Sequence, residues 1–418
     1  MLIYITTNNS ILFAVVKEIY FSLKIILPIL KKTMHQHLQN LLQQRTDTNL
    51  YRQRLCHETK QQPELMIDGE KYLSFCSNDY LGLAVHPKLI KAWQEGAEIY
   101  GVGSGASHLV TGHTQAHHAL EEELAAFMRR ERALLFSTGY MANVGVLSAL
   151  LSRHDAVFTD KLNHASLIDG ALLSRAKVQR FPHNDMERLA YLLANTSARH
   201  KLIVVDGVFS MDGDLADLPA IVKLAHQHNA WVMVDDAHGF GAVGKTGRGT
   251  LEHFNLSVKD VQILMGTLGK AAGVSGAFVA GDEVLIEALI QSARSYIYTT
   301  ALPPALAHTL RESVHILDNE PQHREQLNDL IAYFKQQAQQ YDIELMPSDT
   351  AIQPIVIGDA GRALALSQRL KAEHQLIVTA IRPPTVPGNT ARLRITLCSL
   401  HTKENIDYLM KALIKVLN

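Results

Sequence analysis

Short apolar runs alternate with segments of helical periodicity through the middle of the chain. Five runs of four or five residues, rich in valine, isoleucine and leucine, are typical of strands buried on both faces: residues 133–136, 156–159, 202–205, 231–234 and 261–265. Each of the first three is followed by a short turn and then a helical pattern. This order predicts βαβ units and therefore an α/β fold with a mostly parallel, doubly wound central sheet and helices on both faces.

The pattern changes near residue 321, where a long polar helix is predicted up to about residue 341. Beyond it, two strands (353–357 and 392–397) and two helices (362–373 and from 404) predict a smaller α+β domain. We therefore divide the chain into an extension, an N-terminal segment, a large domain and a C-terminal small domain, with bounds 1–33, 34–83, 84–322 and 323–418.

The first 33 residues differ from the rest of the chain. Residues 11–30 are mainly apolar, but two lysines and a glutamate interrupt them and Pro28 breaks the pattern. A membrane-spanning helix needs about 20 residues with few or no charges, so we expect no stable membrane insertion. The polar, helix-forming sequence after Met34 indicates that the natural start is Met34, with residues 1–33 outside the fold. A helix lying on a membrane surface is the alternative.

Composition narrows the class of protein further. The chain has 418 residues, 47% of them apolar, and a net charge of −1, which describes a soluble globular protein of two or more domains. This balance gives no sign of nucleic-acid binding. Cys56, Cys76 and Cys398 are far apart and odd in number, so neither a disulfide framework nor a zinc ribbon is indicated, and a reducing cytoplasm fits.

A single lysine, Lys270, stands in a glycine-rich segment. Gly266 and Gly269 precede it, and a string of small residues follows at 271–276. Residues with almost no side chain let a flat ligand approach the backbone closely. A lysine in such a pocket can form a Schiff base with an aldehyde when burial or cationic neighbours lower its pKa. A surface lysine in a loop is the alternative, and a second motif argues against it.

That second motif consists of Asp235 and His238, which directly follow the apolar run at 231–234. Ligands bind at the carboxyl ends of the strands in open α/β sheets. An aspartate there can pair with the ring nitrogen of pyridoxal phosphate (PLP), which then accepts electrons from a substrate carbanion. A metal site at these residues is the rival interpretation, but no further ligand follows at an obvious spacing.

The turn at Gly139 and Tyr140 comes at the start of a predicted helix. A helix N-terminus, where free backbone N–H groups point outward, is a natural place for a phosphate.

Three other patterns suggest ligand sites without completing them. Residues 101–105 have two glycines of a dinucleotide loop, but no apolar strand precedes them and the third glycine is absent. Asp212 and Asp214 lack the glycine and the glutamate of a calcium loop. Three histidines at near-helical spacing have no glutamate or third ligand placed beside them: His113, His117 and His118. We therefore expect no metal site.

Taken together, the motifs resemble those of the α-oxoamine synthase family of fold-type-I PLP-dependent transferases. The matching strings are SNDYLGL at 77–83, GSGASHLVTGHT at 103–114, DGVFSMDGD at 206–214, DDAHG at 235–239, TLGK at 267–270, IRPPTVP at 381–387 and ARLRITL at 391–397. The resemblance extends from about Met34 to the end of the chain. It implies a large PLP-binding domain and a small domain built from the N- and C-terminal segments, in a homodimer with its active site at the subunit interface.

The resemblance also implies roles for individual residues. Lys270 would hold PLP covalently, Asp235 would pair with the ring nitrogen, and His164 would stack on the ring and border the substrate. The other cofactor contacts would come from Gly139, Tyr140, Thr267, Ser210 and His238, and from Thr299 or Thr300 of the other subunit. Substrate contacts would come from Arg52, Asn78, Thr385, Arg382 and Arg394. The chain has Asp206 where the family usually has glutamate, which puts a direct contact from that position in doubt.

The implied reaction is a decarboxylative condensation of an amino acid with an acyl thioester. The strings GASHLVTGH and IRPPTVP favour L-alanine and a pimeloyl thioester, carried by coenzyme A or by a carrier protein. A sister enzyme using glycine or serine with another thioester is one alternative. A second alternative is a catalytically silent subunit that serves as a binding partner. The presence of Lys270, Asp235 and His238 argues against it.

Overall fold

The computed structural model describes residues 6–417, and it describes side chains at 15–22, 24 and 33–417. The chain divides into two units, Met1–Leu55 and Cys56–Asn418. The first unit contains one long helix, α1 (Thr6–Asp47), which runs without interruption through Met34 and whose described side chains are exposed up to residue 47. Among the described residues, no helix is long and apolar enough to cross a membrane. The predicted domain bounds, including the start at Met34, stay predictions.

A seven-stranded sheet forms the centre of the second unit, and it confirms the predicted α/β fold. Its strand order is β3-β9-β8-β7-β6-β4-β5. All neighbours from β5 to β8 pair in parallel, whereas β9 is antiparallel to both β8 and β3. The strands are β3 (Arg132–Phe136), β4 (Ala156–Asp160), β5 (Lys177–Phe181), β6 (Lys201–Asp206), β7 (Trp231–Asp235), β8 (Ile263–Thr267) and β9 (Ala277–Gly281).

Alternate side chains of these strands enter two separate apolar clusters, one on each face of the sheet. On β7, for example, Met233 belongs to one cluster and Val234 to the other. Because successive residues of a strand point to opposite faces, a run that is apolar at every position belongs between two helical layers. One layer includes α4 (Gly139–Leu150), α5 (Ala165–Leu173) and α9 (Glu283–Ser292); the other includes α3 (Gln115–Phe127), α7 (Leu218–Gln227) and α11 (Pro304–Asn319).

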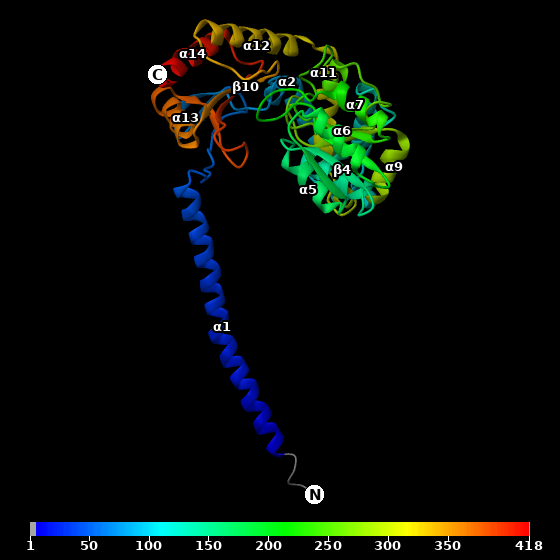
Figure 1. Ribbon diagram of the computed structural model, residues 1–418, viewed down its shortest axis with the longest axis vertical. Coiled ribbons are helices and arrows are strands. Elements are labelled where there is room, and N and C mark those ends of the chain that lie inside the picture. Colours follow the sequence, from blue (N-terminus) through cyan, green and yellow to red (C-terminus); the bar gives the residue numbers. More distant parts are fainter. Residues whose placement is uncertain (1–5, 418) are drawn as a thin grey trace. The chain divides into compact units, whose positions relative to one another are not determined.

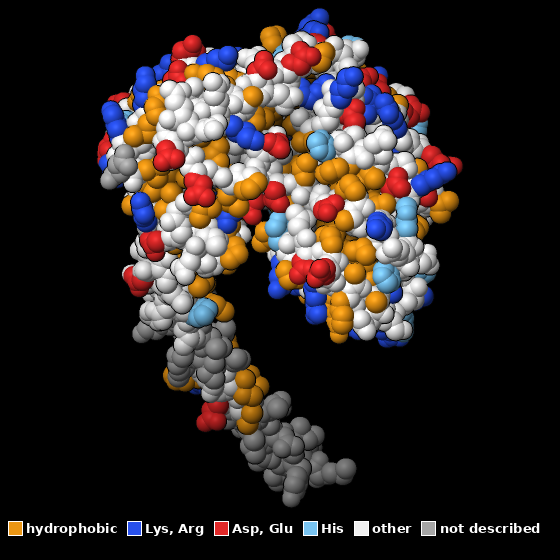
Figure 2. Space-filling view, turned by 45° about the horizontal axis from the view of Figure 1, so that its top comes forward, with side chains coloured by type: hydrophobic (Ala, Val, Ile, Leu, Met, Phe, Trp, Pro, Cys, Tyr) orange, Lys and Arg blue, Asp and Glu red, His pale blue; other side chains and the backbone are white. Residues whose placement is uncertain are grey.

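The remaining helices of this part of the chain are short or peripheral. They are α2 (Pro87–Tyr100), α6 (Met186–Asn195), α8 (Thr250–His253) and α10 (Arg294–Ile297), with single turns η1 (Leu83–Val85) and η2 (His108–Gly112). Figure 1 shows α5 and α6 beside the large sheet near β4. Acidic and basic side chains are interspersed on the face seen in Figure 2, in keeping with the near-zero net charge.

Two three-stranded sheets form the smaller part, and they join the two ends of the second unit. One has the order β1-β2-β11 and the other β10-β13-β12. Strand β2 pairs in parallel with β11, so the segment before residue 84 completes a sheet with the C-terminal region, as expected. The elements are β1 (Glu64–Ile67), β2 (Glu70–Ser74), β10 (Ile352–Gly358), β11 (Leu376–Ile377), β12 (Thr379–Ile381), β13 (Ala391–Thr396), α12 (Gln322–Gln340), α13 (Ala360–His374) and α14 (Lys403–Leu417).

Candidate active site

The predicted cofactor residues lie at one edge of the large sheet, where its parallel strands end. Asp235 is the last residue of β7, and Lys270 follows β8. His164 is the N-cap of α5, in the turn after β4. Gly139 and Tyr140 begin α4, in the turn after β3. Since these strands run in the same direction, their carboxyl ends bring together side chains that are up to 131 residues apart in sequence (Gly139 to Lys270).

Asp235 is buried and held by two hydrogen bonds. Its Oδ2 accepts a hydrogen bond of 2.6 Å from Nδ2 of Asn143, and its Oδ1 accepts one of 3.0 Å from the backbone N–H of Ala237. Asn143 is itself fully buried and also donates to Oγ of Ser166. The carboxylate therefore has a fixed orientation at the end of its strand. No sequence motif points to Asn143, a polar residue inside a mainly apolar helix.

Lys270 has an environment that increases its fraction of free amine near neutral pH. Burial lowers the pKa of Lys270 to about 8, against the opposing effect of the Asp235 and Asp206 carboxylates. The positive charge of Arg394 lowers that pKa further. Deprotonation is what a lysine needs to act as a nucleophile or as a base. This is the perturbation that the glycine-rich context predicted.

Asp206 ends β6 next to Asp235, with which it shares a register position in the sheet. Burial and the charge of Asp235 raise the pKa of Asp206 well above its usual value. Its Oδ2 accepts a 2.9 Å hydrogen bond from the backbone N–H of His164, while Oδ1 is buried and has no hydrogen-bond partner among the described residues. Two like charges this close disfavour simultaneous ionisation, and the raised pKa of Asp206 favours its protonated form.

His164 is oriented by Ser166, which also accepts a hydrogen bond from Asn143. Its Nδ1 lies 2.7 Å from Oγ of Ser166. Burial lowers the pKa of His164, so the ring is neutral at pH 7. A neutral, fixed imidazole is suited to stacking against a flat aromatic ligand. Its predicted stacking role itself stays a prediction.

A chain of polar contacts leads from His238 to Arg394. The hydroxyl of Tyr80 lies 2.5 Å from Nδ1 of His238 and 3.4 Å from Oδ1 of Asn78. Asn78 Oδ1 also accepts from Nη2 of Arg394 at 3.3 Å, and Nε of Arg394 donates to the backbone carbonyl of Ser210 at 2.7 Å. Four residues predicted separately, in four distant segments of the chain, are therefore connected: Asn78, Ser210, His238 and Arg394. Tyr80 was missed as a site residue, although it lies inside the string SNDYLGL.

The pKa values along this chain follow from burial. Burial raises the pKa of Tyr80 to about 12, although the charge of Arg394 acts in the opposite direction. Burial, together with the charge of Lys270, lowers the pKa of His238 well below its usual value. A protonated phenol therefore faces a neutral imidazole, which leaves the other ring nitrogen, Nε2, to make a separate contact.

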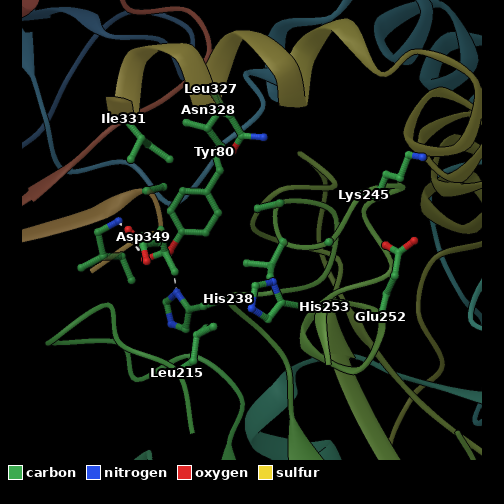
Figure 3. Close-up of a pocket in the computed structure, with 16 residues that line it drawn as sticks. Tyr80, Leu215, His238, Lys245, Glu252, His253, Leu327, Asn328, Ile331 and Asp349 are labelled. Atoms are coloured by element: carbon green, nitrogen blue, oxygen red, sulfur yellow. Dashed lines mark hydrogen bonds between the residues drawn. The ribbon is translucent and has the colours of Figure 1, made fainter. Parts of the chain in front are cut away.

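A cavity of about 480 Å³ lies beside this pair, and Tyr80 and His238 form part of its wall. Figure 3 shows the two side chains pointing toward one another on one side of the cavity, with Lys245 and Glu252 on the far side. Leu327 and the rest of the α12 face close it. Lys270 does not line this space, whereas His238, one of the predicted cofactor contacts, does.

The turn at Gly139 requires glycine for a steric reason. A Cβ atom there would lie 2.7 Å from Cγ2 of Thr267, closer than a real Cβ contact. The hydroxyl of Thr267 donates to the carbonyl of Ala237 at 3.3 Å, which connects this turn to the Asp235 strand end. The hydroxyl of Tyr140 donates to Asp169 at 2.5 Å. The α4 N-terminus and Thr267 thus lie side by side, as a phosphate site needs.

The other predicted residues lie elsewhere in the chain. Thr299 and Thr300 follow α10, and Arg382 and Thr385 lie in the turn between β12 and β13. Arg52 is exposed and belongs to the first unit, which is described by itself. The roles of all five stay predictions.

Two of the metal interpretations can be compared with the structure. The acidic groups of the supposed calcium loop have cationic partners, because Asp212 pairs with Arg392 and Asp214 with His183. His117 is buried, and its Nε2 lies 2.6 Å from the carbonyl of Leu302. The expectation that no glutamate lies beside the histidines was wrong: Glu121, one turn further along α3, brings a carboxylate oxygen within 4.8 Å of His113 and His118 nitrogens.

Comparisons with known proteins agree with this geometry. The model of the aminotransferase class I and II family matches residues 70–413. The chain belongs to this family. An 8-amino-7-oxononanoate synthase of Thioalkalivibrio sulfidiphilus is 57% identical over 90% of this chain and 96% of its own length.

Solved structures of the family show the same fold. The 8-amino-7-oxononanoate synthase of Francisella tularensis is 35% identical, with a TM-score of 0.72 over 83% of this chain and 98% of that chain. Serine palmitoyltransferase of S. paucimobilis, solved with PLP and myriocin bound, is 30% identical, with a TM-score of 0.86 over 92% of this chain and 97% of that chain. The fold of this family member is thus that of a fold-type-I PLP enzyme.

The residues at the sheet edge fit a PLP group on chemical grounds. A buried amine with a lowered pKa, a buried ionisable carboxylate and a neutral imidazole converge there. The glycine at position 139 keeps the helix N-terminus open beside Thr267. These are the groups needed to bind an aldehyde, a ring nitrogen, a ring face and a phosphate.

Proposed function

We propose that this chain is a PLP-dependent acyltransferase that condenses L-alanine with a pimeloyl thioester, giving 8-amino-7-oxononanoate, carbon dioxide and the free thiol, a step of biotin biosynthesis. The observation that carries the proposal is the buried Lys270 with its pKa lowered to about 8 beside Asp235, in a chain 57% identical to a synthase of this name. When bound, PLP supplies an electron sink for the charge that develops at the α-carbon of alanine.

Lys270 performs the proton transfers in this proposal. With PLP bound, its amine would hold the cofactor aldehyde and would then act as the base that removes the proton from the α-carbon of alanine. Asp235, fixed by Asn143 and Ala237, holds a proton at the ring nitrogen. His164 packs on the ring face, and His238 and Ser210 contact the ring oxygen. Gly139, Tyr140 and Thr267 bind the phosphate.

The substrate carboxylate is assigned to Arg394. Its guanidinium is held by the carbonyl of Ser210 and by Asn78 and Thr396, with Nη atoms oriented by two of these contacts. A preoriented guanidinium fork is the usual partner for a carboxylate. Asn78, Arg382, Thr385 and Arg52 are assigned to the acyl donor and its entry path.

The assembly in this proposal is a cytoplasmic homodimer. Thr299 or Thr300 of one subunit would reach the phosphate bound by the other. Three cysteines without a disulfide between them fit a reducing compartment.

A sister activity is the second candidate, because the solved serine palmitoyltransferase has a TM-score of 0.86 with this chain, compared with 0.72 for the solved synthase. The test is a matrix of steady-state assays: alanine, glycine and serine, each with pimeloyl-CoA, a pimeloyl carrier protein and palmitoyl-CoA. We expect the highest kcat/KM for alanine with a pimeloyl donor. Higher kcat/KM for serine or glycine would overturn the assignment, and no turnover by protein that binds PLP would favour the silent subunit.

A further inference from the structure

Two histidines and a glutamate meet where three helices come together. His86 is the N-cap of α2, Glu320 is the C-cap of α11, and His323 lies in the first turn of α12. One nitrogen of each histidine and one oxygen of the carboxylate lie within 4.8 Å of one another. The two imidazole rings meet edge to face, with centroids 5.4 Å apart. We call these three residues the junction triad.

Both histidines of the junction triad have an unsatisfied nitrogen. Nδ1 of His86 and Nε2 of His323 are buried, and neither has a hydrogen-bond partner among the described residues. Buried polar atoms almost always have a partner, so two such atoms in one cluster require an explanation. A neutral imidazole offers one lone pair, which a metal ion can accept.

The spacing of the triad fits a small divalent ion. Nε2 of His323 lies 3.7 Å from Oε2 of Glu320. Ligand atoms about 2.0–2.1 Å from a tetrahedral zinc ion are about 3.4 Å from each other, so small side-chain rotations would close the site. Two imidazoles, one carboxylate and a water molecule make up a common zinc ligand set. We propose that the junction triad binds a first-row divalent metal ion, with Zn²⁺ as its representative, and thereby fixes the start of α12 against α2.

Lys88 is the competitor of the metal ion at this site. Its Nζ lies 2.6 Å from Oε1 of Glu320, and Nε2 of Gln322 donates to Oε2 at 3.0 Å. A carboxylate has about four lone-pair sites, so Oε2 can still coordinate a metal. The Lys88 side chain is 53% exposed and flexible, which lets it remain as an outer partner of the carboxylate or turn into solvent. The positive charge of Lys88 nevertheless repels a cation. Removing that charge should therefore strengthen metal binding, whereas removing a ligand should weaken it.

The cluster of His113, His118 and Glu121 provides a matched control. Glu121 Oε1 already accepts a 3.0 Å hydrogen bond from the backbone of Leu135, and the exposed His118 pairs with Glu122 at 3.4 Å. Neither of those histidines has an unsatisfied buried nitrogen. This second cluster therefore tests whether proximity of potential ligands is by itself enough for a metal ion to bind.

The experiment measures zinc binding to the full-length, PLP-loaded protein. Chelator-treated wild type and variants are dialysed against ZnCl₂, and the bound metal is counted by mass spectrometry. We expect one equivalent in wild type and in His118→Asn, and loss of that equivalent in His86→Asn, His323→Asn and Glu320→Gln. Lys88→Gln should bind zinc several-fold more tightly. Zinc should also raise the Tm of wild type but not that of His323→Asn.

Equal zinc binding by wild type, His86→Asn and His323→Asn would overturn the proposal, as would loss of zinc only in His118→Asn or weaker binding by Lys88→Gln. If a triad variant does not fold, X-ray absorption at the zinc edge of wild type decides, because a ligand shell with two imidazoles and oxygen is expected. A shell containing sulfur or fewer than two imidazoles would contradict it. Since all samples carry PLP, metal binding by the cofactor is common to all of them.

Discussion

Two pairs of carboxylates near the carboxyl ends of the parallel strands have different electrostatic surroundings: the members of one pair repel each other, whereas a histidine lies between the members of the other. Asp235 and Asp206, at the ends of β7 and β6, are buried together, and burial, together with the charge of Asp235, raises the pKa of Asp206. Asp160 at the end of β4 and Asp214 in the loop after β6 have His183 between them, with contacts of 3.3 Å and 2.8 Å. The first pair has negative charge that can interact with Lys270 and with a cationic group of a ligand. In the second pair, His183 offsets part of the negative charge and holds the loop that carries Ser210.

The contrast shows how the same residue type serves chemistry or structure. A buried pair of like charges destabilises the folded protein unless a cation joins it, which is what a protonated ring nitrogen would do. A carboxylate pair bridged by an imidazolium already has part of its charge offset within the fold.

The largest effect is expected for Lys270→Ala. It removes the amine that holds the cofactor and transfers the α-proton, so turnover should fall below detection while the fold persists. Activity with alanine and pimeloyl-CoA, together with circular dichroism, checks this. Turnover near the wild-type rate would contradict the role of Lys270, and His253→Gln, a residue in the wall of the 480 Å³ cavity, serves as the control.

Asp235→Asn should lower turnover by orders of magnitude without loss of folding. An amide keeps the size of the side chain and can still accept from the N–H of Ala237, but it cannot offset the charge on a protonated ring nitrogen. Rapid-mixing absorbance with alanine and steady-state rates would measure the loss. A normal rate would mean that another group keeps the ring protonated.

His183→Gln tests the second pair through stability. Burial acts to lower the pKa of His183, but hydrogen bonds and charges from Asp160 and Asp214 raise it to about 10. A folded pKa above the unfolded value of about 6.5 contributes stability that is complete below pH 6.5 and lost as the pH rises through about 10. We therefore expect the variant to be less stable by about 3 kcal/mol at pH 6.

The measurement is the difference in unfolding free energy between wild type and His183→Gln across pH 6 to 10. That difference should shrink toward alkaline pH. A difference independent of pH would show that His183 acts by packing against Phe209, 4.3 Å between ring centroids, and not by its charge.

Sequence patterns predicted the sheet because its strands are apolar at every position, and they predicted Asp235, His238 and Lys270 because these follow such strands. They missed β5, since its pattern, KVQRF, includes exposed polar residues typical of an edge strand. They also missed Tyr80 and Asn143, whose roles depend on partners 158 and 92 residues away. Local patterns reveal a residue's own environment, whereas these contacts arise only when strands and helices pack. Helical spacing, by contrast, could have revealed Glu121, which is three residues from His118.

Asp206→Asn should have the smallest effect and so completes the comparison. Because its folded pKa lies well above the unfolded value of about 3.8, Asp206 lowers stability progressively as the pH rises above 3.8. The amide resembles the protonated carboxyl and can still accept from the N–H of His164, so turnover should stay within about threefold of wild type. Relative to wild type, the variant should gain stability between pH 4 and pH 8, measured by thermal unfolding. A loss of activity as large as that of Asp235→Asn would show that Asp206 is ionised and that the two carboxylates share one role, because only a charged side chain is altered electrostatically by this substitution.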